Sequence, residues 1–422
     1  MSEINKLLKF IDNNPTAFHV VANVKETLSK EGYKELKESE DWKLKAGAKN
    51  FVTRNSSSLI AFMVPKGKFK GFRIFSAHTD SPSFRIKENP EITFDEYIRL
   101  NVEKYGGMIV SSWLDRPLSL AGRVLYEEAS GIEEKLVNID RDLLVIPNVA
   151  IHMNSDINKG YQYGIQNDIP PLFAQGKDKK GSFAKLIAKE TGIKADKILG
   201  SDLFLYPRQK GFVFGASKEF AASPRLDDQA CCFAGLQGLI GAENGGYVNI
   251  LALFDNEEVG SGTKQGADST FLEDTLYRIC DAMGLGRTDY LKALSDSFAL
   301  SADNAHGVHP SMSGKADPVN RPILNKGVVL KFNGNQKYAT DASSAAFVRA
   351  IARKGGIDLQ DYANNSDIPG GSTLGNISTA HVSIRTADIG LAQLSMHSSC
   401  ETMGSKDIDG MIKLATAFYS MK

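Results

Sequence analysis

The feature of this sequence that most constrains its fold is a change of pattern near residue 90, which reverses near residue 221. On both sides, apolar runs typical of strands, such as 248–254, alternate with helical patterns such as 231–240. That alternation indicates an α/β sheet layered with helices. In between, short alternating segments separated by Gly, Pro, Asn or Asp are typical of β-hairpins. We therefore predict one α/β domain from residues 1–90 and 221–422, interrupted by a β-rich domain over 91–220.

Composition excludes several classes of protein. The 422 residues carry 50 Lys and Arg against 50 Asp and Glu, so the charge pattern expected of a general nucleic-acid binder is missing. No apolar run approaches the roughly 18 residues that a transmembrane helix needs. Four cysteines are too few for a disulfide framework and indicate a reducing compartment. We expect a cytoplasmic globular protein with neither nucleic-acid nor membrane partners.

Five short polar motifs each follow an apolar run that is typical of a strand: FSAHTDSP, SPRLDDQA, LFDNEEVGSG, LSADNAHGVHP and LSMHSSCET. In open α/β sheets, ligands bind outside the carboxyl ends of the strands, where groups distant in sequence meet. The motifs contain imidazoles and carboxylates but no pair of thiolates at metal-binding spacing. This donor set suits a catalytic zinc or another divalent ion. Its size fits two metals that share a carboxylate.

Each motif taken singly has a structural explanation. His78 can be a hydrogen-bonded histidine at a strand end, and Glu257–Glu258 a charged turn. Asp227 can cap the helix that follows it, because Asp is a good N-cap residue. His306 and His309 can be ordinary loop residues. The coincidence of all five motifs at strand ends favours the metal site.

The motifs also identify a family. HTDSPSFRIK, WLDRPLSLAGRV, SPRLDDQACCFAGLQ, FDNEEVGSGTKQGA, SADNAHGVHP and DIGLAQLSMHS occur in this order, and nearly the whole chain resembles the M18 zinc aminopeptidases, the aspartyl aminopeptidases in particular. The resemblance implies a phosphorylase/hydrolase-like three-layer catalytic domain (1–90 and 221–422), interrupted by a β-rich dimerisation domain (91–220). It also implies two zinc ions per subunit, with other divalent metals possible, and a homo-oligomer, expected to be a dodecamer built from dimers.

The resemblance assigns the metal ligands residue by residue. His78 and Asp303 would bind one zinc, Glu258 and His397 the other, and Asp227 both. The commoner family sequence is RLDN, whereas this chain has Asp228 after Asp227, and Asp228 receives no metal role.

The same resemblance assigns the remaining roles. Glu257 would be the general base, and Asp80 would orient the imidazole of His78. His152 matches a family histidine that reaches the active site of a neighbouring subunit, although a solvated loop histidine explains it equally well. Lys331 matches a lysine that pairs with the acidic side chain of the substrate's first residue, whereas most lysines simply lie on a solvated face.

Within the β-rich segment, two further features are predicted. A polar stretch over residues 154–181 predicts a long loop, and Trp113 and Leu118 are expected at the surface, where they would help to form the dimer contact.

The expected function is therefore removal of the N-terminal residue from peptides with a free N-terminus, with a preference for Asp or Glu. One alternative is an M18 aminopeptidase with neutral or broad preference. Others are an N-acyl amino acid deacylase or an M42-type glutamyl aminopeptidase on the same scaffold. A different class is a non-catalytic assembly protein on a decayed peptidase fold. Its signature would be a missing ligand or base, and the motifs lack neither.

Overall fold

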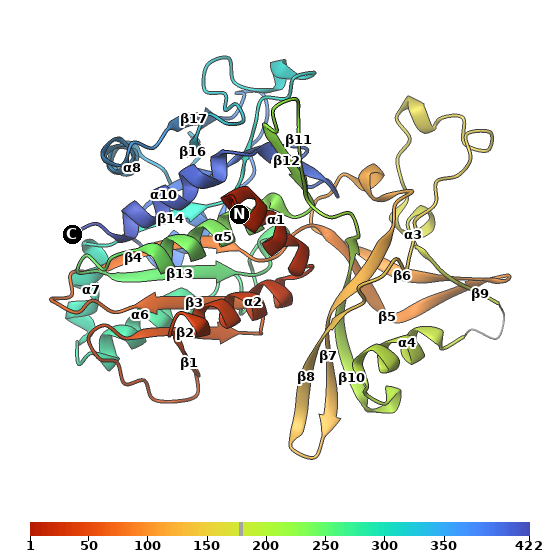
Figure 1. Cartoon of the computed structure of the whole chain (residues 1–422), viewed down its shortest axis with the longest axis horizontal. Coiled ribbons are helices and arrows are strands. Elements are labelled where there is room, and N and C mark those ends of the chain that lie inside the picture. The colour runs from red at the N-terminus through yellow and green to blue at the C-terminus, as the bar shows by residue number, and fades with distance from the viewer. Residues whose placement is uncertain (177–179) are drawn as a thin grey trace. The chain divides into compact units, whose positions relative to one another are not determined.

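The computed structural model describes residues 1–176 and 180–422, and the chain forms two compact units (Figure 1). The first unit consists of Met1–Asp80, Gly211–Met396 and Glu401–Lys422, and the second of Ser81–Lys210 and His397–Cys400. The sequence predicts the boundaries between the two units near residues 90 and 220, whereas the main segment of the second unit is Ser81–Lys210. The first difference arises because one continuous strand, β5 (Ser83–Phe94), already belongs to the second unit.

The first unit is built on a mixed nine-stranded sheet. Its order is β1 (Lys34–Leu36), β2 (Lys49–Arg54), β3 (Ser58–Met63), β13 (Val248–Phe254), β4 (Phe72–His78), β14 (Phe298–Ala302), β18 (Arg385–Gly390), β16 (Val328–Phe332) and β17 (Leu359–Ala363). The central strands β13, β4, β14 and β18 are mutually parallel, whereas β3 and β16 are antiparallel to their neighbours in this central group. The carboxyl ends of four strands therefore meet at one edge.

Helices cover both faces of this sheet, and β13 shows why. Leu251 and Leu253 belong to one buried cluster, whereas Ile250 and Ala252 belong to another, because successive side chains of a strand point to opposite faces. The first cluster includes α1 (Glu3–Asn13), α2 (Ala17–Lys30), α5 (Leu226–Gly241), α8 (Ala342–Gly355) and α10 (Asp407–Tyr419). The second includes α6 (Phe271–Ala282), α7 (Arg287–Ser295) and α9 (Leu374–His381). The mixed α/β prediction is confirmed.

A smaller five-stranded sheet completes the first unit. Its order is β11 (Phe212–Phe214), β12 (Phe220–Ser223), β20 (Glu401–Gly404), β19 (Ala392–Leu394) and β15 (Ala305–His306). Short 3-10 helices occur at η5 (Glu257–Val259) and η6 (Ser313–Lys315).

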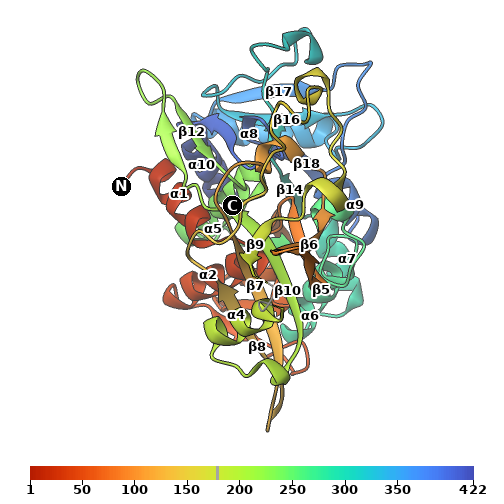
Figure 2. The same ribbon diagram turned by 90° about the vertical axis from the view of Figure 1, so that its right-hand side faces the viewer.

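The second unit is a six-stranded antiparallel sheet with a core of its own. Its order is β8 (Gly131–Asn138), β7 (Leu118–Glu128), β10 (Ile198–Pro207), β5, β6 (Tyr97–Tyr105) and β9 (Leu172–Gln175), accompanied by η1 (Val110–Trp113), η2 (Ile157–Lys159), η4 (Ala195–Lys197), α3 (Ile165–Asp168) and α4 (Ser182–Thr191). Figure 2 labels the strands β5 to β10 and the helix α4 of this unit.

Two sequence expectations for the second unit are wrong. Trp113 and Leu118 are buried, because the Trp113 ring packs edge to face on Phe84, 5.2 Å between centroids, and Leu118 joins the same core. The predicted loop over 154–181 contains α3, and it contains β9, which pairs with β6. Residues 177–179 of that stretch lie outside the described part of the chain.

Among the described residues, no helix is both long and apolar enough to cross a membrane.

The packing of α5 on α10 generates a stability prediction. A Cβ atom at Gly238 would lie 2.5 Å from the Cβ of Ala415 on α10, so Gly238→Ala should destabilise the protein by about 1–3 kcal/mol through overpacking. Gly241, on the same helix, is the control, because a Cβ there would meet Thr416 only at 3.8 Å. Gly241→Ala should be neutral or stabilise by up to about 1 kcal/mol. Urea unfolding measures both, and unchanged stability of Gly238→Ala would refute the close packing.

Candidate metal centre

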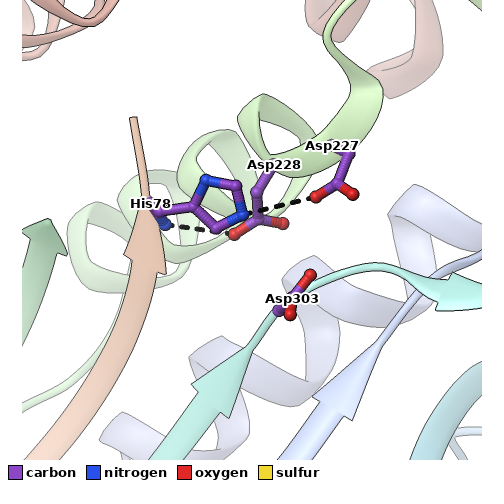
Figure 3. Close-up of side chains that lie close together, drawn as sticks. All are labelled: His78, Asp227, Asp228 and Asp303. Carbon is purple, nitrogen blue, oxygen red and sulfur yellow. Dashed lines mark hydrogen bonds and ion pairs between the residues drawn. The ribbon is translucent and has the colours of Figure 1, made fainter. Parts of the chain in front are cut away.

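Four buried side chains converge at the carboxyl edge of the main sheet (Figure 3). His78 is the last residue of β4, Asp303 follows β14, and Asp227 and Asp228 lie in the first turn of α5. One potential ligand atom from each residue lies within 4.8 Å of those of the other three. The meeting follows from topology, because β4 and β14 are parallel neighbours and their ends therefore lie side by side.

The His78 ring is held from two sides. Its Nδ1 lies 3.1 Å from the backbone oxygen of Asp80, and its Nε2 lies 3.4 Å from Oδ1 of Asp227. A proton on Nδ1, assigned from that hydrogen bond to a carbonyl, leaves the Nε2 lone pair directed into the cluster. Burial lowers the pKa of His78, but the carboxylates around it outweigh burial and raise the pKa well above its ordinary value.

The carboxylates crowd one another. Burial raises the pKa of Asp228 well above its ordinary value, and repulsion from Asp303 and Asp227 adds to this although His78 opposes it. Burial also raises the pKa of Asp303, against the attraction of Lys331. Like charges at this separation need a compensating cation. An imidazole with three carboxylates is a donor set that suits a divalent metal, so the residues fit the ion that the motifs predict.

A second group shares His78. Potential ligand atoms of His78, Glu257 and Glu258 lie within 4.8 Å of one another. Both glutamates belong to η5, which begins three residues after the last residue of β13. Asp80 fixes this turn, because its two carboxylate oxygens accept hydrogen bonds from the backbone N–H groups of Glu257 and Glu258, each at 3.1 Å. Asp80 therefore positions η5 as well as lying beside His78, a connection that the sequence does not reveal.

Glu257 differs from its neighbours in its environment. Burial raises its pKa to about 8, the attraction of His78 opposes this shift, and repulsion from Asp303, Glu258 and Asp80 adds to it. In the absence of a cation, this carboxyl group is thus inclined to hold a proton near neutral pH.

Lys331 lies beside the cluster of acidic side chains. Its ammonium is buried, with Nζ 3.5 Å from Oδ2 of Asp303 and 5.4 Å from the centroid of the Tyr338 ring. Burial lowers the pKa of Lys331, but Asp303 and other nearby groups raise it above its ordinary value. The lysine therefore stays charged and faces the cluster.

Two buried acids received no role from the sequence. Glu401 is buried and accepts a hydrogen bond from the backbone N–H of Asp227 at 3.0 Å. Asp388, also buried, accepts from the hydroxyl of Thr373 at 2.6 Å and from the backbone N–H of Ala339 at 2.5 Å. Asp388 is the first residue of DIGLAQLSMHS, and Glu401 belongs to LSMHSSCET. Their membership of these motifs was the available signal.

Four further histidines belong to the motifs that the sequence singles out. His397 belongs to the segment His397–Cys400, which packs with the second unit, and its carbonyl accepts from the backbone N–H of Ile109 at 3.0 Å. His152 is exposed in a turn of the second unit. His306 and His309 are exposed and belong to none of the potential ligand groups among the described residues. The roles of His397 and His152 thus stay predictions.

Comparison with known proteins gives a consistent result. Residues 10–419 match the family described as aminopeptidase I zinc metalloprotease (M18). A relative from Clostridium acetobutylicum, named probable M18 family aminopeptidase 2, is 47% identical over 99% of this chain and 98% of its own length. A relative from Ectopseudomonas mendocina with the same name is 40% identical over the same shares of the two chains.

Solved structures agree. The cryo-EM structure of the Ape4 and Nbr1 complex contains a chain with a TM-score of 0.95 and 36% identity, over 99% of this chain and 85% of that one. The structure titled mApe1 dodecamer from S. cerevisiae has a TM-score of 0.87 and 29% identity, over 99% and 96% of the two chains.

Proposed function

The chain belongs to the M18 family of zinc aminopeptidases, and from that premise we propose that it cleaves N-terminal residues at a two-zinc site and prefers Asp or Glu there. The observation that carries the proposal is the convergence of His78, Asp227 and Asp303 with the Glu257–Glu258 turn at one sheet edge. Zinc dependence and aminopeptidase activity come with the family. The metal count, the residue roles and the substrate preference are the proposed part.

The ligands would divide between two ions. His78 and Asp303 would hold one, Glu258 and His397 the other, and Asp227 both. The support is that Asp227 groups with His78 and Asp303, while Glu258 groups with His78. Glu401 fixes the backbone at Asp227, which helps to hold a bridging carboxylate in place. When bound, two zinc ions lower the pKa of water and polarise the peptide carbonyl.

Glu257 is the general base in this proposal. Its carboxylate takes a proton from the attacking water and passes it to the departing amine, as a general acid–base does. Asp80 fixes the position of the η5 backbone, and so of Glu257, because its carboxylate accepts two backbone hydrogen bonds from η5. The acidic groups of the site attract the free α-amino group of the substrate, which explains why only the first residue is removed.

The base assignment generates a prediction. Glu257→Gln keeps the shape of the side chain but cannot accept the proton, so kcat should fall about 10²–10⁴-fold with metal content unchanged. Asp80→Asn is the comparison, because it disturbs positioning only and should cost about 10–100-fold. Steady-state kinetics with elemental analysis measure both. Normal turnover by Glu257→Gln would exclude it as the base.

Lys331 provides the preference for acidic substrates. Its buried ammonium pairs with the carboxylate of an N-terminal Asp or Glu, whereas a neutral side chain leaves the charge without that partner. The support is its burial, its retained charge and its place beside the cluster. The competing role is structural, because the same ammonium neutralises Asp303.

A matched substrate pair separates the two roles. Lys331→Met should lower kcat/KM for an N-terminal Asp substrate at least tenfold, about 1.4 kcal/mol, and change that for Leu little. Chromogenic aminoacyl substrates measure both values. Equal losses on Asp and Leu would make Lys331 a structural partner of Asp303. A wild-type enzyme that prefers Leu would instead place the chain among M18 members of broad specificity.

The protein assembles, in our proposal, into dimers through the second unit and then into a dodecamer. The structural relative from S. cerevisiae is titled a dodecamer. Around His152 in the second unit, Val149, Ile151 and Met153 are exposed by 52%, 48% and 78%, which is unusual for apolar side chains unless a partner covers them. His152 then reaches the active site of the neighbouring subunit. The four cysteines are all free, which supports a reducing compartment such as the cytoplasm.

Mixing two inactive variants tests the shared site. His152→Ala spoils the site of a neighbour, and Glu257→Gln spoils its own. Subunits exchanged between the two variants should regain a substantial fraction of wild-type activity, since one site in each mixed dimer is complete. Light scattering confirms the oligomer. Mixed oligomers without recovered activity, or a fully active monomer at nanomolar concentration, would contradict the shared site.

A further inference from the structure

Asp228 lies among the proposed ligands although its sequence position carried no metal role. The residue is completely buried, and Oδ2 accepts a hydrogen bond from the backbone N–H of His78 at 3.1 Å. Its other carboxylate oxygen, Oδ1, has no hydrogen-bond partner within the described part of the chain. A potential ligand atom of Asp228 lies within 4.8 Å of those of His78, Asp227 and Asp303, and Figure 3 shows the four side chains around one space.

The surroundings of Asp228 do not neutralise it. The thiol of Cys231 is only a weak hydrogen-bond donor. The imidazole of His78 favours the charged form of Asp228, but Asp227 and Asp303 share the same imidazole, so one positive group faces three carboxylates. A buried carboxylate oxygen that faces other carboxylates is costly unless a cation is present. Asparagine at this position would place an uncharged amide there instead, with the same shape.

We propose that Asp228 is an additional acidic residue of the metal centre, which supplies a third carboxylate to the ion held by His78, Asp227 and Asp303 and shifts that position towards harder ions such as Mn²⁺. Carboxylate ligands suit Mg²⁺, Ca²⁺ and Mn²⁺, whereas imidazole ligands suit zinc, copper, iron and nickel. The proposal rests on the metal site proposed above and adds a residue and a selectivity to it.

Removing the charge of Asp228 should have opposite effects on the stability of the metal-free and the metal-loaded protein. Without a cation, the third carboxylate repels Asp227 and Asp303 and destabilises the fold. With a cation, it adds attraction. Asp228→Asn should therefore raise the melting temperature of the metal-free protein and reduce the increase that Mn²⁺ produces.

The test compares the full-length wild type with Asp228→Asn and a control, Asp407→Asn. Asp407 is also a buried carboxylate, but it accepts backbone N–H groups of Asn325 and Gly327 and is absent from the ligand groups found among described residues. Competition with a chelator of known affinity gives the Kd for Mn²⁺ and for Zn²⁺. We expect Asp228→Asn to weaken Mn²⁺ binding at least tenfold and Zn²⁺ binding by less, and Asp407→Asn to change neither.

The outcomes separate this inference from the proposed function. A wild type that binds neither ion would overturn the metal site itself. A wild type that binds both, with Asp228→Asn unchanged or with equal losses for Mn²⁺ and Zn²⁺, would overturn only the role of Asp228. If circular dichroism shows Asp228→Asn to be unfolded, Asp228→Ser is measured in the same way and judged by the same two results.

Discussion

Mutual repulsion of buried carboxylates is the constraint on which the rest of the site depends. Asp227, Asp228 and Asp303 lie with His78 in a space from which solvent is almost excluded. A proton or a cation relieves this repulsion, and the cluster fits divalent metals because its donors are oxygens and an imidazole. The fold therefore gathers like charge at one sheet edge, and in the proposed function a bound metal ion offsets that charge.

The surrounding structure holds this charge in place through hydrogen bonds to the backbone. Glu401 anchors Asp227, Asp228 anchors His78, and Asp80 anchors the η5 turn that carries Glu257 and Glu258. Each of these acids thus accepts a hydrogen bond from the backbone N–H group of a proposed ligand or base that is distant from it in sequence. This arrangement fixes the proposed ligands and base before substrate arrives, which is what preorganised catalysis requires.

Strand-end motifs predicted much of this arrangement. His78, Asp303 and the Glu257–Glu258 pair were found because each follows an apolar run, and parallel strands bring such ends together. Contacts across the fold leave no local pattern, so the pairing of Lys331 with Asp303 could not be predicted. Burial of Trp113 was missed for the same reason, since its partner Phe84 lies on β5, distant in sequence from the η1 helix that carries Trp113. The strand β9 was missed because a polar, glycine-rich stretch hides its pairing with β6.

The central claim is that one sheet edge holds two metal ions. Anomalous diffraction from zinc-loaded crystals, recorded on both sides of the zinc edge, tests it most directly. The account predicts two anomalous peaks per chain, one beside His78 and Asp303 and one beside Glu258, with Asp227 adjacent to both. A single peak, or peaks away from these residues, would contradict it.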